Sequence, residues 1–111
     1  RIATFGGGDE PLQACMILSN EPGYYKTGAY GIRIENLVLV EERDVPGAEK
    51  PMLGFQTLTF APIDRTLIAT DLLNREEQAW LDAYHAAVLD LVGPQLEGDA
   101  LAWLKAACAP L

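Results

Sequence analysis

The sequence predicts an α+β fold in which antiparallel strands are followed by two helices. Between residues 16 and 60, apolar side chains come in short runs or alternate with polar ones, and Pro and Gly separate the runs. Beyond Pro62 the apolar spacing lengthens from two residues to about 3.6, which is typical of helices. Strands that precede helices, without an internal repeat, indicate an α+β arrangement.

Three strands are expected in the first half of the chain. Residues 16–21 form the first, which Pro22-Gly23 ends or bends, and residues 24–30 form a connection. Residues 31–40 form a long second strand, residues 41–51 an exposed loop, and residues 55–60 a third strand. On the second strand, alternation places one set of side chains on one face (Arg33, Glu35, Leu37 and Leu39) and a second set on the other (Ile32, Ile34, Asn36, Val38 and Val40).

Two helices are expected in the second half. Asn74 followed by Glu77 is the spacing of a capping box, in which each side chain bonds the other residue's backbone N–H. The helix that follows should bury one stripe and end near Gly93-Pro94; the stripe comprises Trp80, Tyr84, Val88 and Leu91. A shorter helix covers residues 98–108. His85 is expected to be a structural or surface histidine.

Composition limits the class of protein. The 111 residues carry a net charge of -8 and a pI near 4.4, which disfavour a nucleic-acid partner or an anionic membrane surface. Cys15 and Cys108 lie far apart in a Cys-poor chain, so we expect free, buried thiols and a cytoplasmic protein. The opening residues 1–5 read as the middle of a domain, so we interpret the chain as a fragment.

Glu21 and Glu35 are the candidate site residues. If the first two strands pair about a centre near Gly28, these glutamates lie opposite each other, with Cβ atoms about 4.5–5.5 Å apart. Facing carboxylates repel and need a shared proton, an arginine or cations; Arg33 lies on the same face as Glu35. Oxygen ligands combined with imidazole suit manganese, cobalt or zinc, whereas an all-oxygen site would suit magnesium or calcium. Spacing alone leaves the alternative of two separate surface glutamates open.

Two segments carry a resemblance to a known family. Residues 16–25 (MILSNEPGYY) and residues 28–38 (GAYGIRIENLV) resemble the segments that hold the last two metal ligands of the M24 "pita-bread" metallopeptidases, in the aminopeptidase P (Xaa-Pro aminopeptidase) branch. Residues 54–64 (GFQTLTFAPID), 80–85 (WLDAYH) and 102–104 (AWL) resemble that branch's C-terminal extension. The resemblance implies that residues 1–52 belong to the pita-bread catalytic domain and residues 53–111 to the extension.

The same resemblance implies roles for individual residues. Glu21 and Glu35 would be metal ligands, and Glu21 would also act on the bridging water as the catalytic carboxylate. Arg33 would brace the carboxylates and Tyr30 would line the pocket. Two aspartates and a histidine complete the family's dinuclear site, and none of them is present here. The implied cofactor is a pair of divalent ions, manganese foremost, with zinc or cobalt as alternatives, and the fragment alone should bind none tightly.

The implied parent hydrolyses the bond between an N-terminal residue and a following proline, and forms a homodimer. Its partners would be peptides with proline at the second position, with neither nucleic acid nor membrane. With two of five ligands, the fragment alone should be inactive and should self-associate through the exposed Ile32, Ile34 and Val38 face. The alternative is a non-catalytic pita-bread relative that serves as a binding or dimerisation module.

Overall fold

The computed structural model describes residues 10–111; the opening residues 1–5, on which the fragment interpretation rests, lie outside this range. The chain divides into one compact unit that ends at Thr59 and a second that runs from Phe60 to Leu111. Strands make up the first and helices the second, so the predicted α+β class is confirmed.

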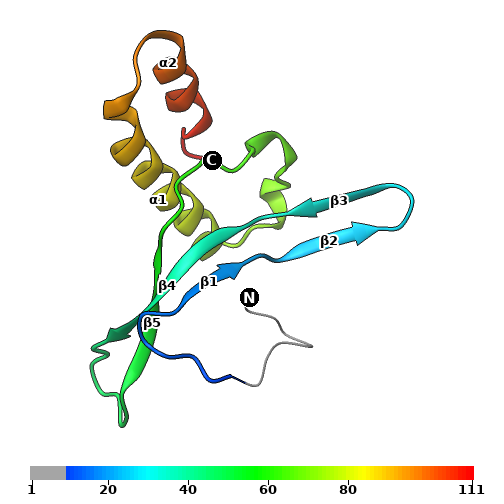
Figure 1. Cartoon of the computed structure of the whole chain (residues 1–111). Helices are drawn as coiled ribbons and strands as arrows, with labels where there is room; N and C mark the ends of the chain where they lie inside the picture. The colour runs from blue at the N-terminus through cyan, green and yellow to red at the C-terminus, as the bar shows by residue number, and fades with distance from the viewer. Residues whose placement is uncertain (1–9) are drawn as a thin grey trace. The chain divides into compact units, whose positions relative to one another are not determined.

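The first unit contains five strands, β1 (Ile17–Asn20), β2 (Gly23–Lys26), β3 (Tyr30–Arg33), β4 (Asn36–Arg43) and β5 (Met52–Thr57). β1, β4 and β5 form an antiparallel sheet with β4 in the middle, and β2 and β3 form a separate two-stranded ribbon. Figure 1 shows that the ribbon prolongs the β1–β4 pair, so that β1–β2 and β3–β4 are the two arms of one long hairpin.

One pairing register runs along both arms of this hairpin. Ile17 pairs with Leu39 in β1–β4, and Gly23 pairs with Arg33 in β2–β3. Both pairs are centred on Gly28, whose φ of 71° suits a residue without Cβ. The predicted hairpin centre is therefore confirmed.

Several predicted strand boundaries are wrong, and β4 also continues to Arg43, into the loop expected over residues 41–51. The single strand expected over residues 31–40 is two strands, β3 and β4, and the connection expected over residues 24–30 contains β2. Pro22 explains the division into two strands, because it cannot donate a ladder hydrogen bond to the opposite arm. The backbone bond from the Ile34 N–H to Pro22 O, at 3.1 Å, spans the break. The third strand runs over Met52–Thr57 rather than residues 55–60.

The apolar face of the second arm is divided between two environments. Val38 and Val40 are buried in the three-stranded sheet, where β4 has a neighbour on each side. Ile32 and Ile34 are 47% and 46% exposed. Ile32 lies in β3, which pairs with β2 alone, and Ile34 lies in the break between β3 and β4. The prediction that Val38 would be exposed with them is therefore wrong.

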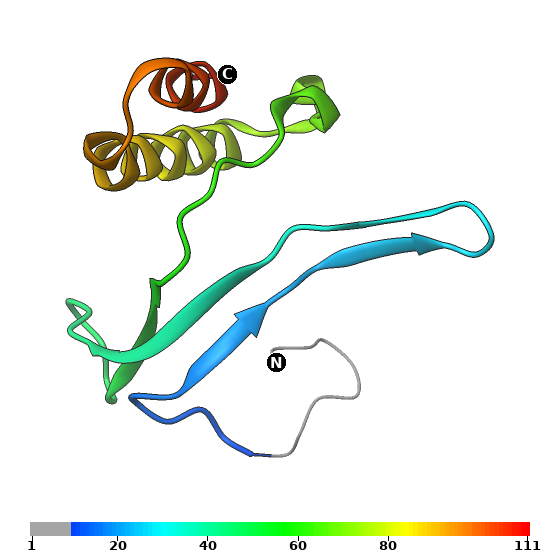
Figure 2. The same ribbon diagram turned by 45° about the horizontal axis from the view of Figure 1, so that its top comes forward.

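The second unit consists of three short 3₁₀ turns and two helices. The elements are η1 (Arg65–Leu67), η2 (Thr70–Leu72), α1 (Arg75–Val92), η3 (Gly93–Gln95) and α2 (Gly98–Ala107). α2 folds back against α1 (Figure 2), and the buried residues that join them are Tyr84, Val88, Leu104 and Cys108. None of the helices in residues 10–111 is long and apolar enough to cross a membrane.

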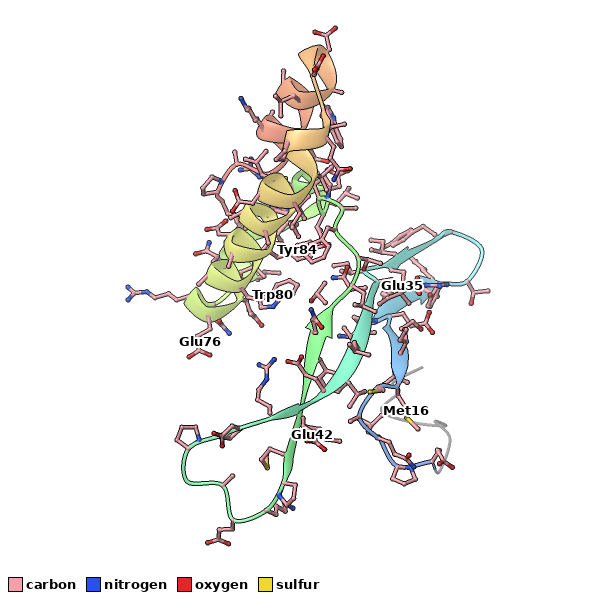
Figure 3. The ribbon with its side chains drawn as sticks, turned by 60° about the vertical axis from the view of Figure 1, so that its left-hand side comes forward. Met16, Glu35, Glu42, Glu76, Trp80 and Tyr84 are labelled. Carbon is pink, nitrogen blue, oxygen red and sulfur yellow. The ribbon has the colours of Figure 1, made fainter. Side chains whose placement is uncertain are left out.

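The start of α1 confirms the predicted capping box. Asn74 Oδ1 accepts the Glu77 N–H, and Glu77 Oε2 accepts the Asn74 N–H, both at 2.9 Å. The predicted buried stripe is wrong at its ends, since Trp80 and Leu91 are 55% and 54% exposed. The buried set is instead Leu81, Tyr84, His85 and Val88. The Trp80 ring stacks on Tyr84 at 5.5 Å and lies at the edge of this face (Figure 3).

Both cysteines are free, as predicted, but only one of them is buried. Cys108 belongs to the helical core, and its burial raises the pKa of the thiol. Cys15 is exposed, which corrects the expectation of two buried thiols.

Candidate metal centre

Glu21 and Glu35 occupy the break between the two pairs of strands. Glu21 follows β1, and Glu35 precedes β4; Figure 3 labels Glu35. The register extends across the break, because Asn20 pairs with Asn36 on one side and Gly23 with Arg33 on the other. The two glutamates therefore stand opposite each other, as the sequence predicted, at a point where neither arm is held in a regular ladder.

Arg33 lies between the two carboxylates. Its Nη1 atom is 3.3 Å from Glu21 Oε2 and 3.5 Å from Glu35 Oε2. The side chain of Glu21 is 22% exposed and that of Glu35 is 43% exposed, so Glu21 is the more enclosed carboxylate. One guanidinium against two carboxylates leaves one net negative charge, which favours a cation in this region.

Tyr25 fixes the guanidinium from its other side. Arg33 Nε donates to the Tyr25 hydroxyl at 2.9 Å. This hydrogen bond first, and then the charges of Glu21 and Glu35, hold the pKa of Arg33 above its usual value. Arg33 therefore stays charged across the physiological range and keeps offsetting the two carboxylates.

Two glycines make room for the Tyr25 ring. A Cβ at Gly31 would lie 2.7 Å from Tyr25 Cδ1, and a Cβ at Gly23 would lie 2.9 Å from the Tyr25 hydroxyl. Such distances are well inside van der Waals contact, so the ring lies flat against the backbone of both strands. The absence of two side chains thus places the phenol where Arg33 can reach it.

The start of β4 is fixed next to Glu35. Thr59 Oγ1 accepts the Leu37 N–H at 3.1 Å and donates to Asn36 Oδ1 at 2.8 Å. The Leu58 N–H donates to Leu37 O at 2.9 Å, which extends the pairing beyond β5. These bonds hold the residues directly after Glu35 and so limit where its carboxylate can lie.

Tyr30, the other residue that the resemblance places at the pocket, lies on the opposite face of the hairpin. It pairs with Lys26, and its ring is 6.1 Å from that of Tyr24. Tyr25 shares a face with Arg33 instead, because Tyr25 pairs with Gly31 and Gly23 pairs with Arg33. The structure therefore brings together Glu21, Arg33 and Glu35, adds Tyr25, and leaves Tyr30 apart.

Tyr25 was not among the predicted site residues, although the sequence carries a signal for it. A hairpin centred on Gly28 puts residue 25 opposite residue 31, on the same face as residues 21, 33 and 35. The register that pairs the glutamates therefore also selects Tyr25 over Tyr30.

The described residues provide an incomplete set of metal ligands. Within residues 10–111, no three His, Cys, Asp or Glu side chains gather closely enough to hold an ion. The single histidine of the chain, His85, is fully buried in the helical unit. The two carboxylates suit a divalent cation in charge and donor type, and further ligands would have to come from outside these residues.

Comparison with known families identifies the class of protein. The model for metallopeptidase family M24 matches residues 1–42, and the model for the C-terminal region of peptidase_M24 matches residues 51–111. The second match alone covers more than half of the chain. The chain therefore belongs to the M24 metallopeptidase family and corresponds to its C-terminal part.

Individual relatives narrow the resemblance to one branch of the family. A probable Xaa-Pro aminopeptidase P of Laccaria bicolor is 50% identical over 105 residues, which are 91% of this chain and 16% of the relative. A protein of the same description from Fusarium vanettenii is 53% identical over 93 residues, which are 80% of this chain and 15% of the relative. The chain thus spans about one-sixth of the length of these curated relatives.

A solved structure agrees in fold. The X-prolyl aminopeptidase of Caenorhabditis elegans, described as a cytosolic enzyme with a di-nuclear active site, matches with a TM-score of 0.82 and 41% identity. The match covers 90% of this chain and 17% of that one. The strands and helices described above are therefore the C-terminal part of a pita-bread fold.

Proposed function

We propose that this chain is part of a dinuclear-metal aminopeptidase that hydrolyses the N-terminal Xaa-Pro bond of peptides. The observation that carries the proposal is the pair of opposed carboxylates, Glu21 and Glu35, joined by Arg33 in a member of the M24 family. The relatives' descriptions as Xaa-Pro aminopeptidases support the choice of bond.

In this proposal Glu21 and Glu35 each contribute carboxylate oxygens to a pair of divalent ions. Manganese is the preferred ion, with zinc or cobalt as alternatives, because the family's site combines oxygen ligands with one imidazole. The description of the C. elegans enzyme as di-nuclear supports two ions rather than one. The remaining ligands would be the two aspartates and the histidine that the family resemblance implies.

When bound, the ions would supply a water of lowered pKa and polarise the scissile carbonyl. Glu21 is the better candidate to accept the proton of that water, because its carboxylate is the more enclosed of the two. Arg33 keeps the carboxylates at a fixed separation, and Tyr25 holds Arg33 in place. A peptide bond to proline lacks the N–H that most peptidases recognise, so the activity requires a dedicated site.

The assembly, compartment and domain division belong to the same proposal. A homodimer is supported by exposed apolar side chains on the helical unit, among them Leu67, Leu72 and Trp103. A cytoplasmic location is supported by the description of the C. elegans enzyme as cytosolic. We place the boundary between the catalytic domain and the C-terminal extension at residues 52–53, close to the start of the second family match.

Charge-neutral substitutions in the parent protein test the carboxylate roles. Glu21→Gln and Glu35→Gln keep side-chain size and remove a ligand charge. Each should lower bound metal and reduce kcat/KM for an Xaa-Pro peptide by more than about 100-fold, since even indirect supports of a metal site are worth about 10–100-fold. Metal analysis and peptide kinetics measure the two effects separately.

Glu42→Gln is the matched control, because Glu42 is an exposed glutamate on β4 that makes no ion pair among the described residues. It should leave metal content and kcat/KM unchanged. If the parent binds no metal and the two site variants change only its self-association, the alternative of a non-catalytic binding or dimerisation module is the correct one.

A further inference from the structure

His85 on α1 is buried completely inside the helical unit, with no exposed surface. The Ile63 N–H donates to His85 Nε2 at 3.0 Å. An imidazole nitrogen that accepts a hydrogen bond carries no proton, so His85 is neutral with its proton on Nδ1. Imidazolium has no acceptor, so the Ile63 bond and a charged His85 are incompatible.

Two further side chains tie the surrounding segments together. Arg65, two residues beyond Ile63, donates to Ala106 O at 3.3 Å and to Pro110 O at 2.9 Å. Asp82, three residues before His85, accepts the Leu111 N–H at 2.9 Å. The segment 63–65 is thus bonded both to α1, through His85, and to residues 106–110, through Arg65. The end of the chain is bonded to α1 through Asp82.

The charged groups near His85 oppose its protonation overall. Burial of the ring first, and then the positive charge of Arg65, lower the pKa of His85, while Asp82 acts in the opposite direction. The Tyr84 ring lies 6.0 Å away, and its hydroxyl exchanges hydrogen bonds with Ala61. Arg65 Nε and His85 Nδ1 are both buried donors without an acceptor among the described residues.

We propose that His85 is an acid-sensitive latch of the helical unit, whose protonation breaks the Ile63 bond, sets a second positive charge beside Arg65 and loosens the segment 61–65 from α1. The helices keep their own hydrogen bonds, so the change begins in that segment and at residues 106–111. Neutral His85 keeps the segment 61–65 bonded to α1, and charged His85 releases it.

The direction of the pH dependence follows from the lowered pKa of the folded state. An unfolded histidine titrates at about 6.5. The stabilisation from neutral His85 is therefore complete above about pH 6.5 and is lost as the pH falls from there toward the lower folded-state value.

The chain contains one histidine, so a single imidazole signal reports on the latch. In an NMR titration of the 111-residue chain labelled at histidine, we expect the Nδ1–H tautomer near neutral pH and a titration midpoint below about 6.5. A midpoint at or above that value, in a chain that retains its helical circular dichroism, overturns the proposal.

Substitutions separate the latch from general acid sensitivity. His85→Gln keeps an acceptor for the Ile63 N–H and cannot become charged. In urea unfolding followed by circular dichroism, the original chain should lose stability between about pH 7.5 and about pH 5.5, and His85→Gln should lose clearly less. Asp90→Asn, at an exposed position on α1, is the matched control and should behave like the original chain. Equal pH dependence in His85→Gln and the original chain contradicts the proposal.

Discussion

At the scale of single residues, Arg33 is what makes two facing carboxylates compatible in this structure. It contacts both Glu21 and Glu35, yet its side chain is 49% exposed. Exposed ion pairs contribute little to folding, typically about 0–1 kcal/mol. The value of the arrangement therefore lies in geometry, because it sets where the two carboxylates stand in the proposed metal site.

Tyr25→Phe tests that geometry in the parent protein, given the proposed aminopeptidase activity. The substitution keeps the ring against Gly23 and Gly31 and removes only the acceptor of Arg33 Nε. A hydrogen bond of this kind is worth about 1 kcal/mol at a partly exposed position, so we expect kcat/KM to fall roughly fivefold. Steady-state kinetics with an Xaa-Pro peptide measure the change.

The neighbouring residue provides the control for this prediction. Tyr24 is on the same strand with its side chain on the opposite face, against Tyr30. Tyr24→Phe should therefore leave kcat/KM unchanged. Equal effects of the two substitutions would show that the hydroxyl of Tyr25 has no specific role.

At the scale of elements, pairing was more predictable from sequence than strand boundaries were. The register follows from one fact, the centre at Gly28, and it fixes Glu21 opposite Glu35 and Tyr25 opposite Gly31. The division of each arm into two strands depends on a missing N–H at Pro22 and on its effect across the hairpin. A strand pattern based on side-chain alternation alone does not include that effect.

The helical stripe shows a second limit of sequence reasoning. Trp80 and Leu91 fit the helical period, but their side chains lie beside the buried face. His85 lies at its centre, where its Nε2 atom accepts the Ile63 N–H from 22 residues earlier in the chain. A polar residue whose partner is so distant in sequence gives no local signal of burial.

The capping box of α1 yields a prediction for this element. Asn74→Ala removes the acceptor of the Glu77 N–H and should destabilise the helical unit by about 1 kcal/mol. Urea unfolding monitored by helical circular dichroism gives the difference. Asn74→Ser retains a capping oxygen and should recover most of the loss. If Asn74→Ala unfolds at the same urea concentration as the original chain, the box has no energetic role.

At the scale of the whole molecule, the first unit displays features that need further protein around them. Large apolar side chains stand exposed on one face of it, namely Ile32, Ile34 and Phe55, and Ile17 is exposed on the other face. Large exposed apolar areas are a feature of interfaces rather than of free surfaces. Together with two carboxylates that carry one uncompensated charge, these areas indicate that the site is completed by residues beyond those described.

The isolated 111-residue chain should consequently lack peptidase activity. It provides two carboxylates for a site that in the proposed mechanism needs five ligands, and its single histidine is buried away from solvent. We expect no cleavage of an Xaa-Pro peptide when manganese, zinc or cobalt is added. Calorimetry should show only weak binding of each metal, because two carboxylates give neither the number nor the mixture of ligands that these ions prefer. The parent protein, assayed in parallel, is the positive control. Measurable turnover by the purified chain, abolished by Glu21→Gln, would mean that this segment assembles a functional centre by itself, and the division of ligands proposed above would then be wrong.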